Sequence, residues 1–235
     1  WHYDNKYIDG SKLLSKTEIK AKNLKENPID IVSSINDCKT TLRNVKWSYT
    51  DSRLGKSIML RMLIHLIGDI HQPLHACTLV NDDFHKGDVG GNAFVIDMPG
   101  ARNLHTYWDR CLKKYSTLSS PLNERHFEKL EGYVDQIVQN YPRSDPAISK
   151  RVKVQSVAEW ARESVKYCIS NVYQGIHLYG TPSALYKEKN FAFIDEQLAV
   201  AGYRLTETLK NVFSNPATLE PRVKKNPLYK RQLTD

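Results

Sequence analysis

The chain has 235 residues, and 34 Lys+Arg against 26 Asp+Glu give it a formal net charge of +8 at pH 7. Its 40% hydrophobic and 26% charged residues are ordinary for a globular protein with a sizeable core, which excludes wholesale disorder. The longest apolar stretch, residues 57–68, contains Arg61 and His65 and is far shorter than the ~20 residues that a membrane-spanning helix needs, so no transmembrane segment is expected. The positive charge favours an anionic partner such as nucleic acid, a phosphate ester or an anionic membrane surface.

The first part of the chain predicts two helices after a polar opening. Residues 1–25 are rich in lysine and lack clear periodicity, so we expect loop and short turns there. Pro28 then begins an apolar-periodic stretch that predicts a helix to about residue 44. A second helix is expected over residues 54–70, ending before Pro73, which cannot continue it.

The rest of the chain predicts one short β element and four more helices. Alternating apolar residues over 92–97, followed by Pro99-Gly100, indicate a short β-hairpin. The helices are expected over residues 104–115, 123–141, 148–176 and 191–213. With no repeat or Gly/Ser-rich linker, the sequence predicts a mainly α fold with one domain over residues 1–213. Residues 214–235 are expected to form a solvated tail, in which residues 221–235 carry five basic side chains against one aspartate.

The four cysteines, Cys38, Cys77, Cys111 and Cys168, are widely separated and form no CxxC pair. This spacing argues against a cysteine zinc site and against a thioredoxin-type motif. An even number is compatible with two disulfides in an oxidising compartment, or with four buried thiols.

The histidines carry the strongest chemical signal in the sequence. Five of the eight lie between residues 65 and 105, and two of these begin HxxxD motifs, His65-to-Asp69 and His105-to-Asp109. The i, i+4 spacing places each pair on one face of a predicted helix. His75 follows the break at Pro73 and can fold back beside the helix end. One such pair alone is more often a surface ion pair, but two pairs with a histidine between them predict a site for more than one divalent metal ion, and mixed imidazole and carboxylate ligands suit zinc.

Several segments resemble, in the order of the family, the motifs of the class I zinc-dependent single-strand nucleases and 3′-nucleotidases. This is the mung bean nuclease type within the phospholipase C/nuclease superfamily. The central run is GDIHQPLH at residues 68–75. The other matching runs are WHY at residues 1–3, GDVGGN at 87–92, NLHTYWD at 103–109, WARES at 160–164 and QLAVAGYRL at 197–205.

The resemblance implies a helical fold with a trinuclear zinc cluster at the bottom of a cleft. By position, its zinc ligands fall into two sets. The first comprises His2, His65 and Asp69, and the second comprises His75, His105 and Asp109. Asp69 takes the central catalytic place because it bridges the first zinc to the third. Tyr3 matches the aromatic residue that stacks on a base, and Asn5 matches a residue that meets the base edge.

The implied activity is hydrolysis of phosphodiester bonds in single-stranded DNA and RNA by a metal-activated hydroxide. The products carry 5′-phosphates, and 3′-nucleotides are a second substrate. The resemblance also implies a secreted or lumenal, endomembrane or lysosome-like location. Two alternatives stay open: a phospholipase C-like phosphodiesterase, and a non-catalytic basic helical component with an incomplete metal site.

The sequence departs from the family pattern at its beginning. The family's amino-terminal tryptophan chelates the third zinc together with a histidine five residues later, where this chain has Lys6. Trp1 instead directly precedes a motif that the family places dozens of residues further on, so we interpret it as a coincidence. We therefore expect that an upstream segment is missing here. It is either a separate, proteolytically cut N-terminal fragment that completes the site or a region of the same chain that lies outside these residues.

Three other residues near these motifs have competing interpretations. His71 lies between the ligand positions and fits a hydrogen-bonded packing role better than an outer-shell one. His85 is expected to be a solvated loop histidine. Glu163 suits either a partner of a metal-binding histidine or an ordinary cap or salt bridge.

Overall fold

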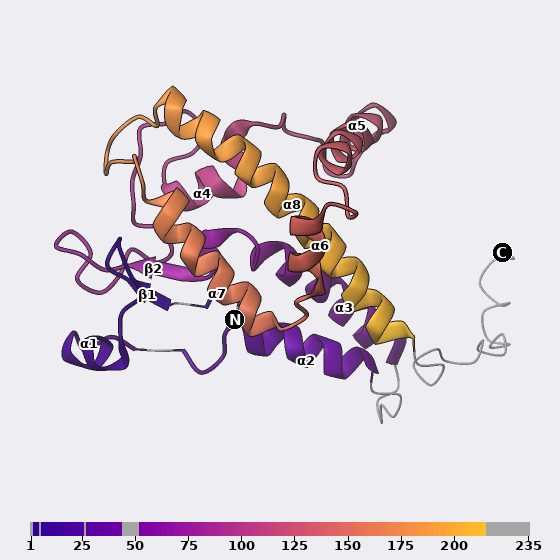
Figure 1. The fold of residues 1–235 in the computed structure, drawn as a ribbon, viewed down its shortest axis with the longest axis horizontal. Helices are drawn as coiled ribbons and strands as arrows, with labels where there is room; N and C mark the ends of the chain where they lie inside the picture. The colour runs from indigo at the N-terminus through magenta and orange to yellow at the C-terminus, as the bar shows by residue number, and fades with distance from the viewer. Residues whose placement is uncertain (1, 5, 26, 44–51, 215–235) are drawn as a thin grey trace, which may run out of the picture.

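The computed structural model describes residues 2–4, 6–25, 27–43 and 52–214, and they form a largely helical molecule (Figure 1). The strands and helices are β1 (Lys6–Ile8), α1 (Lys16–Ala21), α2 (Ile31–Arg43), α3 (Ser52–Asp69), β2 (Cys77–Leu79), α4 (Leu104–Asp109), α5 (Glu124–Asn140), α6 (Pro146–Lys153), α7 (Val157–Tyr167) and α8 (Ala184–Phe213). Three short turns add η1 (Pro73–His75), η2 (Cys111–Lys113) and η3 (Cys168–Val172). The predicted mainly α fold is confirmed. The predicted tail lies outside the described residues except for Ser214.

The helical core forms where α2, α3, α7 and α8 meet. In Figure 1, α8 runs diagonally across the molecule, and both α2 and α3 contact it. Their buried apolar side chains form one cluster of Ile31, Ile35, Leu42, Leu63, Leu66, Ile67, Ile70, Trp160 and Val212, among others. Each such side chain contributes about 1.5–3 kcal/mol when fully buried. This packing fixes α3 up to its carboxyl end, where Asp69 lies.

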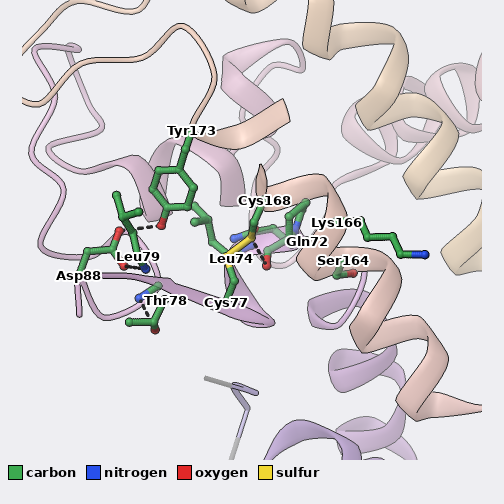
Figure 2. The surroundings of a disulfide bond; sticks show 12 residues. Gln72, Leu74, Cys77, Thr78, Leu79, Asp88, Ser164, Lys166, Cys168 and Tyr173 are labelled. Atoms are coloured by element: carbon green, nitrogen blue, oxygen red, sulfur yellow. Dashed lines mark hydrogen bonds between the residues drawn. A yellow bond between two sulfur atoms is a disulfide. The ribbon is translucent and has the colours of Figure 1, made fainter. Parts of the chain in front are cut away.

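A second cluster surrounds the disulfide between Cys77 and Cys168, which joins β2 to η3 (Figure 2). Trp108 of α4 and Tyr186 of α8 pack in the same cluster, so it ties α4 to the rest of the molecule. The structure matches neither reading of the cysteines, because it has one disulfide, while Cys38 and Cys111 are free thiols.

Most of the predicted helices are present, with different ends. The predictions for residues 28–44, 54–70 and 123–141 match α2, α3 and α5 closely. The expected long helix over 148–176 is instead α6, α7 and η3, because Val154 is extended and the Ser156 side chain caps a new helix by accepting from Glu159 N. Within the described part, α8 starts at Ala184, earlier than the predicted residue 191, because Ser183 caps it.

The predicted helix over residues 104–115 ends early, at Asp109. The next turn, η2, leaves the right-handed helical region: Cys111, Leu112 and Lys113 have φ angles of 49°, 52° and 61°. Three consecutive residues with side chains in this left-handed region cannot extend an α-helix.

The predicted hairpin is present only as an isolated antiparallel bridge between Val95 and Asn103, and the regular sheet of the described residues lies elsewhere. The described residues contain one two-stranded parallel sheet, β1 with β2, in the register Lys6 to Cys77 and Ile8 to Leu79. β1 lies in the opening segment that the sequence predicted as loop and turns, as does α1. Residues 94–96 run antiparallel to residues 102–104 after a turn at Pro99-Gly100, with Leu104 N donating to Phe94 O at 2.9 Å and Ile96 N to Arg102 O at 3.3 Å. The pairing does not extend into strands, because Asp97 N donates to Gly180 O and Val95 O accepts from Tyr179 N.

Within the described ranges, every helix is too short or too polar to span a lipid bilayer.

Candidate metal centre

The first HxxxD motif lies at the carboxyl end of α3. His65 and Asp69 are on one face of the helix, and His65 Nε2 lies 3.1 Å from Asp69 Oδ2. The helix ends at Asp69 because Pro73 follows, and the Gln72 side chain begins η1 by accepting from Leu74 N at 2.6 Å. Gln72 thus turns the chain back toward Asp69.

His75 comes back to the helix end through this turn. Its Nδ1 lies 3.8 Å from Asp69 Oδ2 and donates to the carbonyl oxygen of His2 at 3.0 Å. Burial alone would lower the pKa of His75, but hydrogen bonding to Asp109 and the charge of Asp69 outweigh it and raise the pKa. His75 is therefore buried between two carboxylates.

The second HxxxD motif lies on α4, which Asn103 caps by accepting from Thr106 N at 2.8 Å. His105 Nε2 lies 3.4 Å from Asp109 Oδ2, and His75 Nε2 lies 3.4 Å from Asp109 Oδ1. Gln72 Nε2 also donates to Asp109 Oδ1 at 2.9 Å. The turn after α3 and the helix α4 therefore meet at Asp109.

His2 and Tyr3 close the site from the start of the described chain. His2 Nδ1 lies 3.5 Å from Asp69 Oδ2. The Tyr3 ring is stacked on His75, with ring centroids 5.5 Å apart and 15° between the planes. Tyr3 therefore places an aromatic face directly beside the imidazoles.

Two groups of side chains are arranged as metal ligands are. One is His2, Asp69 and His75, and the other is His75, His105 and Asp109. Within each group the candidate ligand atoms lie within 4.8 Å of one another. His65 lies beside the first group through its 3.1 Å approach to Asp69. The predicted ligand positions thus converge, with His75 common to both groups.

Asp69 gives the clearest sign that a cation belongs here. Three ring nitrogens lie 3.1–3.8 Å from its Oδ2, yet among the described residues this buried oxygen makes no hydrogen bond. A buried carboxylate oxygen without a partner costs free energy. A divalent ion among these imidazoles would satisfy it, so the residues present fit such an ion.

The two groups line a cavity of about 630 Å³. Its lining also includes apolar side chains of α8, namely Phe193, Ile194, Leu198 and Ala201. A cavity lined by both charged and apolar side chains suits a ligand that has a polar and an apolar part.

His71 does not join the metal groups. Its Nδ1 donates to Ile67 O at 2.7 Å, and its Nε2 accepts from Arg204 Nη1 at 2.9 Å. Burial lowers its pKa to about 3, so the ring is neutral. The hydrogen-bonded packing role predicted for His71 is confirmed.

Of the other predicted residues, Glu163 forms salt bridges with Arg151 and Arg204, each at 2.7 Å, which is the ordinary role expected for it. His85 is exposed, as expected. Trp1 and Asn5 lie outside the described residues.

Sequence reasoning missed the groups that hold the ligands in place. Gln72 bonds Asp109, and the carbonyl of Gly90 accepts from His105 Nδ1 at 2.7 Å. Both residues lie in runs that carried the family resemblance, but no role was assigned to either. The adjacent glycines at 90 and 91 were the available signal, because such a pair often marks a backbone that approaches another group closely.

The fold and the site define a helical protein whose cleft gathers paired His/Asp motifs suited to divalent metal ions. The S1/P1 Nuclease family model matches residues 1–214, and the chain belongs to this family, which confirms the resemblance seen in the motifs.

Curated relatives are similar over part of their length. Nuclease S1 from Aspergillus oryzae (strain ATCC 42149 / RIB 40) is 29% identical over 177 residues, which is 67% of this chain and 55% of that protein. Endonuclease 4 from Arabidopsis thaliana is 29% identical over 164 residues, 66% of this chain and 50% of the relative. Endonuclease 1 from the same plant is 26% identical over 201 residues, 82% of this chain and 61% of the relative. The chain spans about half the length of the curated relatives it matches.

Proposed function

We propose that this protein is a zinc-dependent endonuclease that hydrolyses phosphodiester bonds of single-stranded DNA and RNA to 5′-phosphate products. The same site would remove phosphate from 3′-nucleotides. The observation that carries the proposal is the convergence of two His/Asp groups on one cavity, around an Asp69 oxygen that has no hydrogen bond among the described residues. Membership of the S1/P1 nuclease family supports the same class of reaction.

We assign His2, His65 and Asp69 to one metal position and His75, His105 and Asp109 to another, with Asp69 as the central catalytic residue. Bound zinc supplies an activated water and polarises the phosphoryl oxygens. The hydrogen bonds of His105 and His75 support their ligand roles. Each ring donates from Nδ1 to a carbonyl oxygen, so its Nε2 lies toward Asp109.

A site for three zinc ions needs more ligands than these six side chains, since zinc in proteins takes about four. We propose a separate fragment, carrying the ligands at the start of the family pattern, as their source. Adding such a fragment in trans is expected to raise the number of zinc ions bound per chain.

The substrate preference follows from the aromatic side of the site. Tyr3 stacks on His75 at the cavity, and a ring of this kind holds any base by its π-face with ~1–3 kcal/mol and without reading sequence. Asn5 stays a prediction for the base edge. A positively charged chain also attracts a phosphate backbone, so cleavage is expected to weaken with salt.

The location proposed for the protein is secreted or lumenal. The Cys77–Cys168 disulfide supports it, because such bonds form and persist in oxidising compartments.

The test measures zinc content and hydrolysis of single-stranded DNA, RNA, 3′-AMP and phosphatidylcholine. Wild type is compared with Asp69→Asn and His105→Ala, and with His85→Ala as a control in which an exposed histidine is lost. Asp69→Asn and His105→Ala are each expected to lower activity by more than ~100-fold, because loss of an outer-shell partner alone can cost about that much. His85→Ala is expected to keep wild-type rates.

Three outcomes would contradict the proposal. Turnover of phosphatidylcholine without turnover of nucleic acid would favour a phospholipase C-like enzyme. Absence of both zinc and turnover in the wild type would favour a non-catalytic component. Unchanged rates in the two site variants would place the chemistry elsewhere.

A further inference from the structure

Asp88 is a buried carboxylate outside the two metal groups. It lies in the loop after β2, and its side chain is fully buried. Leu79 N donates to its Oδ1 at 2.9 Å, and the Tyr173 hydroxyl donates to its Oδ2 at 2.6 Å (Figure 2). Its own backbone N–H donates to Leu79 O at 2.9 Å. Asp88 thus clamps its loop both to β2 and to the segment that follows η3.

The disulfide reinforces this clamp. Cys77 and Cys168 join β2 to η3, and Tyr173 directly follows η3, so the covalent bond and the Tyr173–Asp88 hydrogen bond connect the same two parts of the chain (Figure 2). The Tyr173 ring also packs on Phe94, with centroids 5.9 Å apart. The hydroxyl that meets Asp88 is therefore held from several sides.

The clamped loop presents backbone carbonyls to His105. Gly90 O accepts from His105 Nδ1 at 2.7 Å, and Gly91 O accepts from His105 N at 3.2 Å. Gly90 has a φ of +60°, and a Cβ there would lie 2.6 Å from Leu74 O, so the loop passes too close to the turn after α3 for any side chain. A small shift of this loop would move the carbonyl that His105 needs.

The carbonyl decides which nitrogen of His105 is available. A carbonyl oxygen only accepts hydrogen bonds, so His105 Nδ1 carries the proton and the Nε2 lone pair is left for a metal ion. A ligand histidine that is held in this way needs no reorientation when the ion arrives.

We propose that Asp88 is a positioning residue, whose clamp holds the Gly90 carbonyl where it fixes the tautomer and ring orientation of His105. The metal consequence rests on the proposed function, whereas the tautomer itself does not. The chemistry explains why a carboxylate is needed here. The two oxygens of Asp88 face donors, and an amide would turn its NH₂ group toward one of them. A carboxylate buried at this depth costs free energy unless its donors satisfy it.

The test uses ¹⁵N-histidine-labelled, metal-free protein at an alkaline pH, where histidines are neutral. Long-range ¹H–¹⁵N correlation spectra report the tautomer of each ring, and His105→Gln assigns the signal of His105. The variants are Asp88→Asn and Tyr173→Phe. Asp97→Asn and Tyr203→Phe are the matched controls: Asp97 is exposed and accepts from Thr181 Oγ1, and the Tyr203 hydroxyl donates to Tyr141 O.

We expect wild type and both controls to show a single Nδ1–H tautomer for His105. Asp88→Asn is expected to show a mixture of tautomers and to bind zinc about 10- to 100-fold more weakly in chelator competition, and Tyr173→Phe is expected to shift in the same direction by less. A folded Asp88→Asn with an unchanged tautomer and zinc affinity would overturn the proposal. If Asp88→Asn does not fold, Tyr173→Phe decides on the same two readouts.

Failure of the proposed function gives a different result. A wild type that fixes the His105 tautomer but hydrolyses no nucleic acid would refute the nuclease activity and still support the positioning role. A wild type with mixed tautomers would refute the positioning role, whatever the activity.

Discussion

His71 makes the stability of this protein depend on pH in a defined window. Its pKa falls to about 3 in the folded protein, chiefly because the ring is buried, while in the unfolded chain it is near 6.5. The unfolded state therefore binds a proton that the folded state refuses. The stability that comes from keeping His71 neutral is fully present above about pH 6.5, and the free energy of unfolding falls as the pH drops from there toward 3. pH 5 lies about 1.5 units below the pKa of the unfolded state, so the free energy of unfolding is lower there by ~2 kcal/mol.

The assay is urea unfolding of chelator-treated wild type and His71→Gln at pH 7 and pH 5. We expect wild type to lose ~2 kcal/mol more than the variant between the two pH values. The comparison cancels any constant cost of the substitution and the titration of the other histidines. His177→Gln, which removes an exposed histidine, serves as the control and is expected to keep the wild-type pH dependence. Equal pH dependence in wild type and His71→Gln would refute the reasoning.

Three other features carry testable expectations. Replacing Cys77 and Cys168 with serine opens a cross-link across 91 residues and is expected to lower the free energy of unfolding by about 4–5 kcal/mol; a loss below ~1 kcal/mol in urea would contradict the chain-entropy estimate. Tyr3→Leu is expected to raise KM for 3′-AMP about 10-fold, whereas Tyr3→Phe keeps the stacking face and the wild-type KM; equal KM values in the two variants would remove Tyr3 from base binding. Gly90→Ala sets a Cβ 2.6 Å from a backbone oxygen and is expected to cost ~1–3 kcal/mol in thermal unfolding, whereas Gly132→Ala, in open space on α5, is expected to stabilise; the opposite ranking would contradict the packing described.

The sequence was informative where the relevant geometry is local. The i, i+4 spacing of each HxxxD motif depends only on helix periodicity, so both pairs could be predicted. Pro73 likewise predicted the end of α3 within one residue. Ser183, in contrast, is a capping residue eight positions before the predicted start of the last helix. The first two turns of α8 have little apolar periodicity, so the sequence does not indicate this earlier start.

Non-local geometry could not be derived in the same way. The contact of His75 with Asp109 joins a turn to a helix that starts about thirty residues later. No sequence periodicity predicts a contact of this kind, and only the family motifs indicate that the two residues belong to one site. The parallel pairing of β1 with β2 has three residues per strand, too few for alternation to reveal. At residues 92–97 the alternate burial of Phe94 and Ile96 correctly indicates an extended segment before a turn, but the pairing that follows is a single antiparallel bridge rather than two strands.

The small parallel sheet has a consequence for the specificity of the site. β1 begins three residues after Tyr3, β2 begins two residues after His75, and Asp4 N donates to His75 O at 2.7 Å. The register that pairs Lys6 with Cys77 therefore sets the position of His2 and Tyr3 along the cleft. A slip of one residue along β2 would bring Tyr3 to the place of His2, offering a phenol where an imidazole faces Asp69. The register of this short sheet thus determines which ring faces Asp69 and which ring stacks on His75.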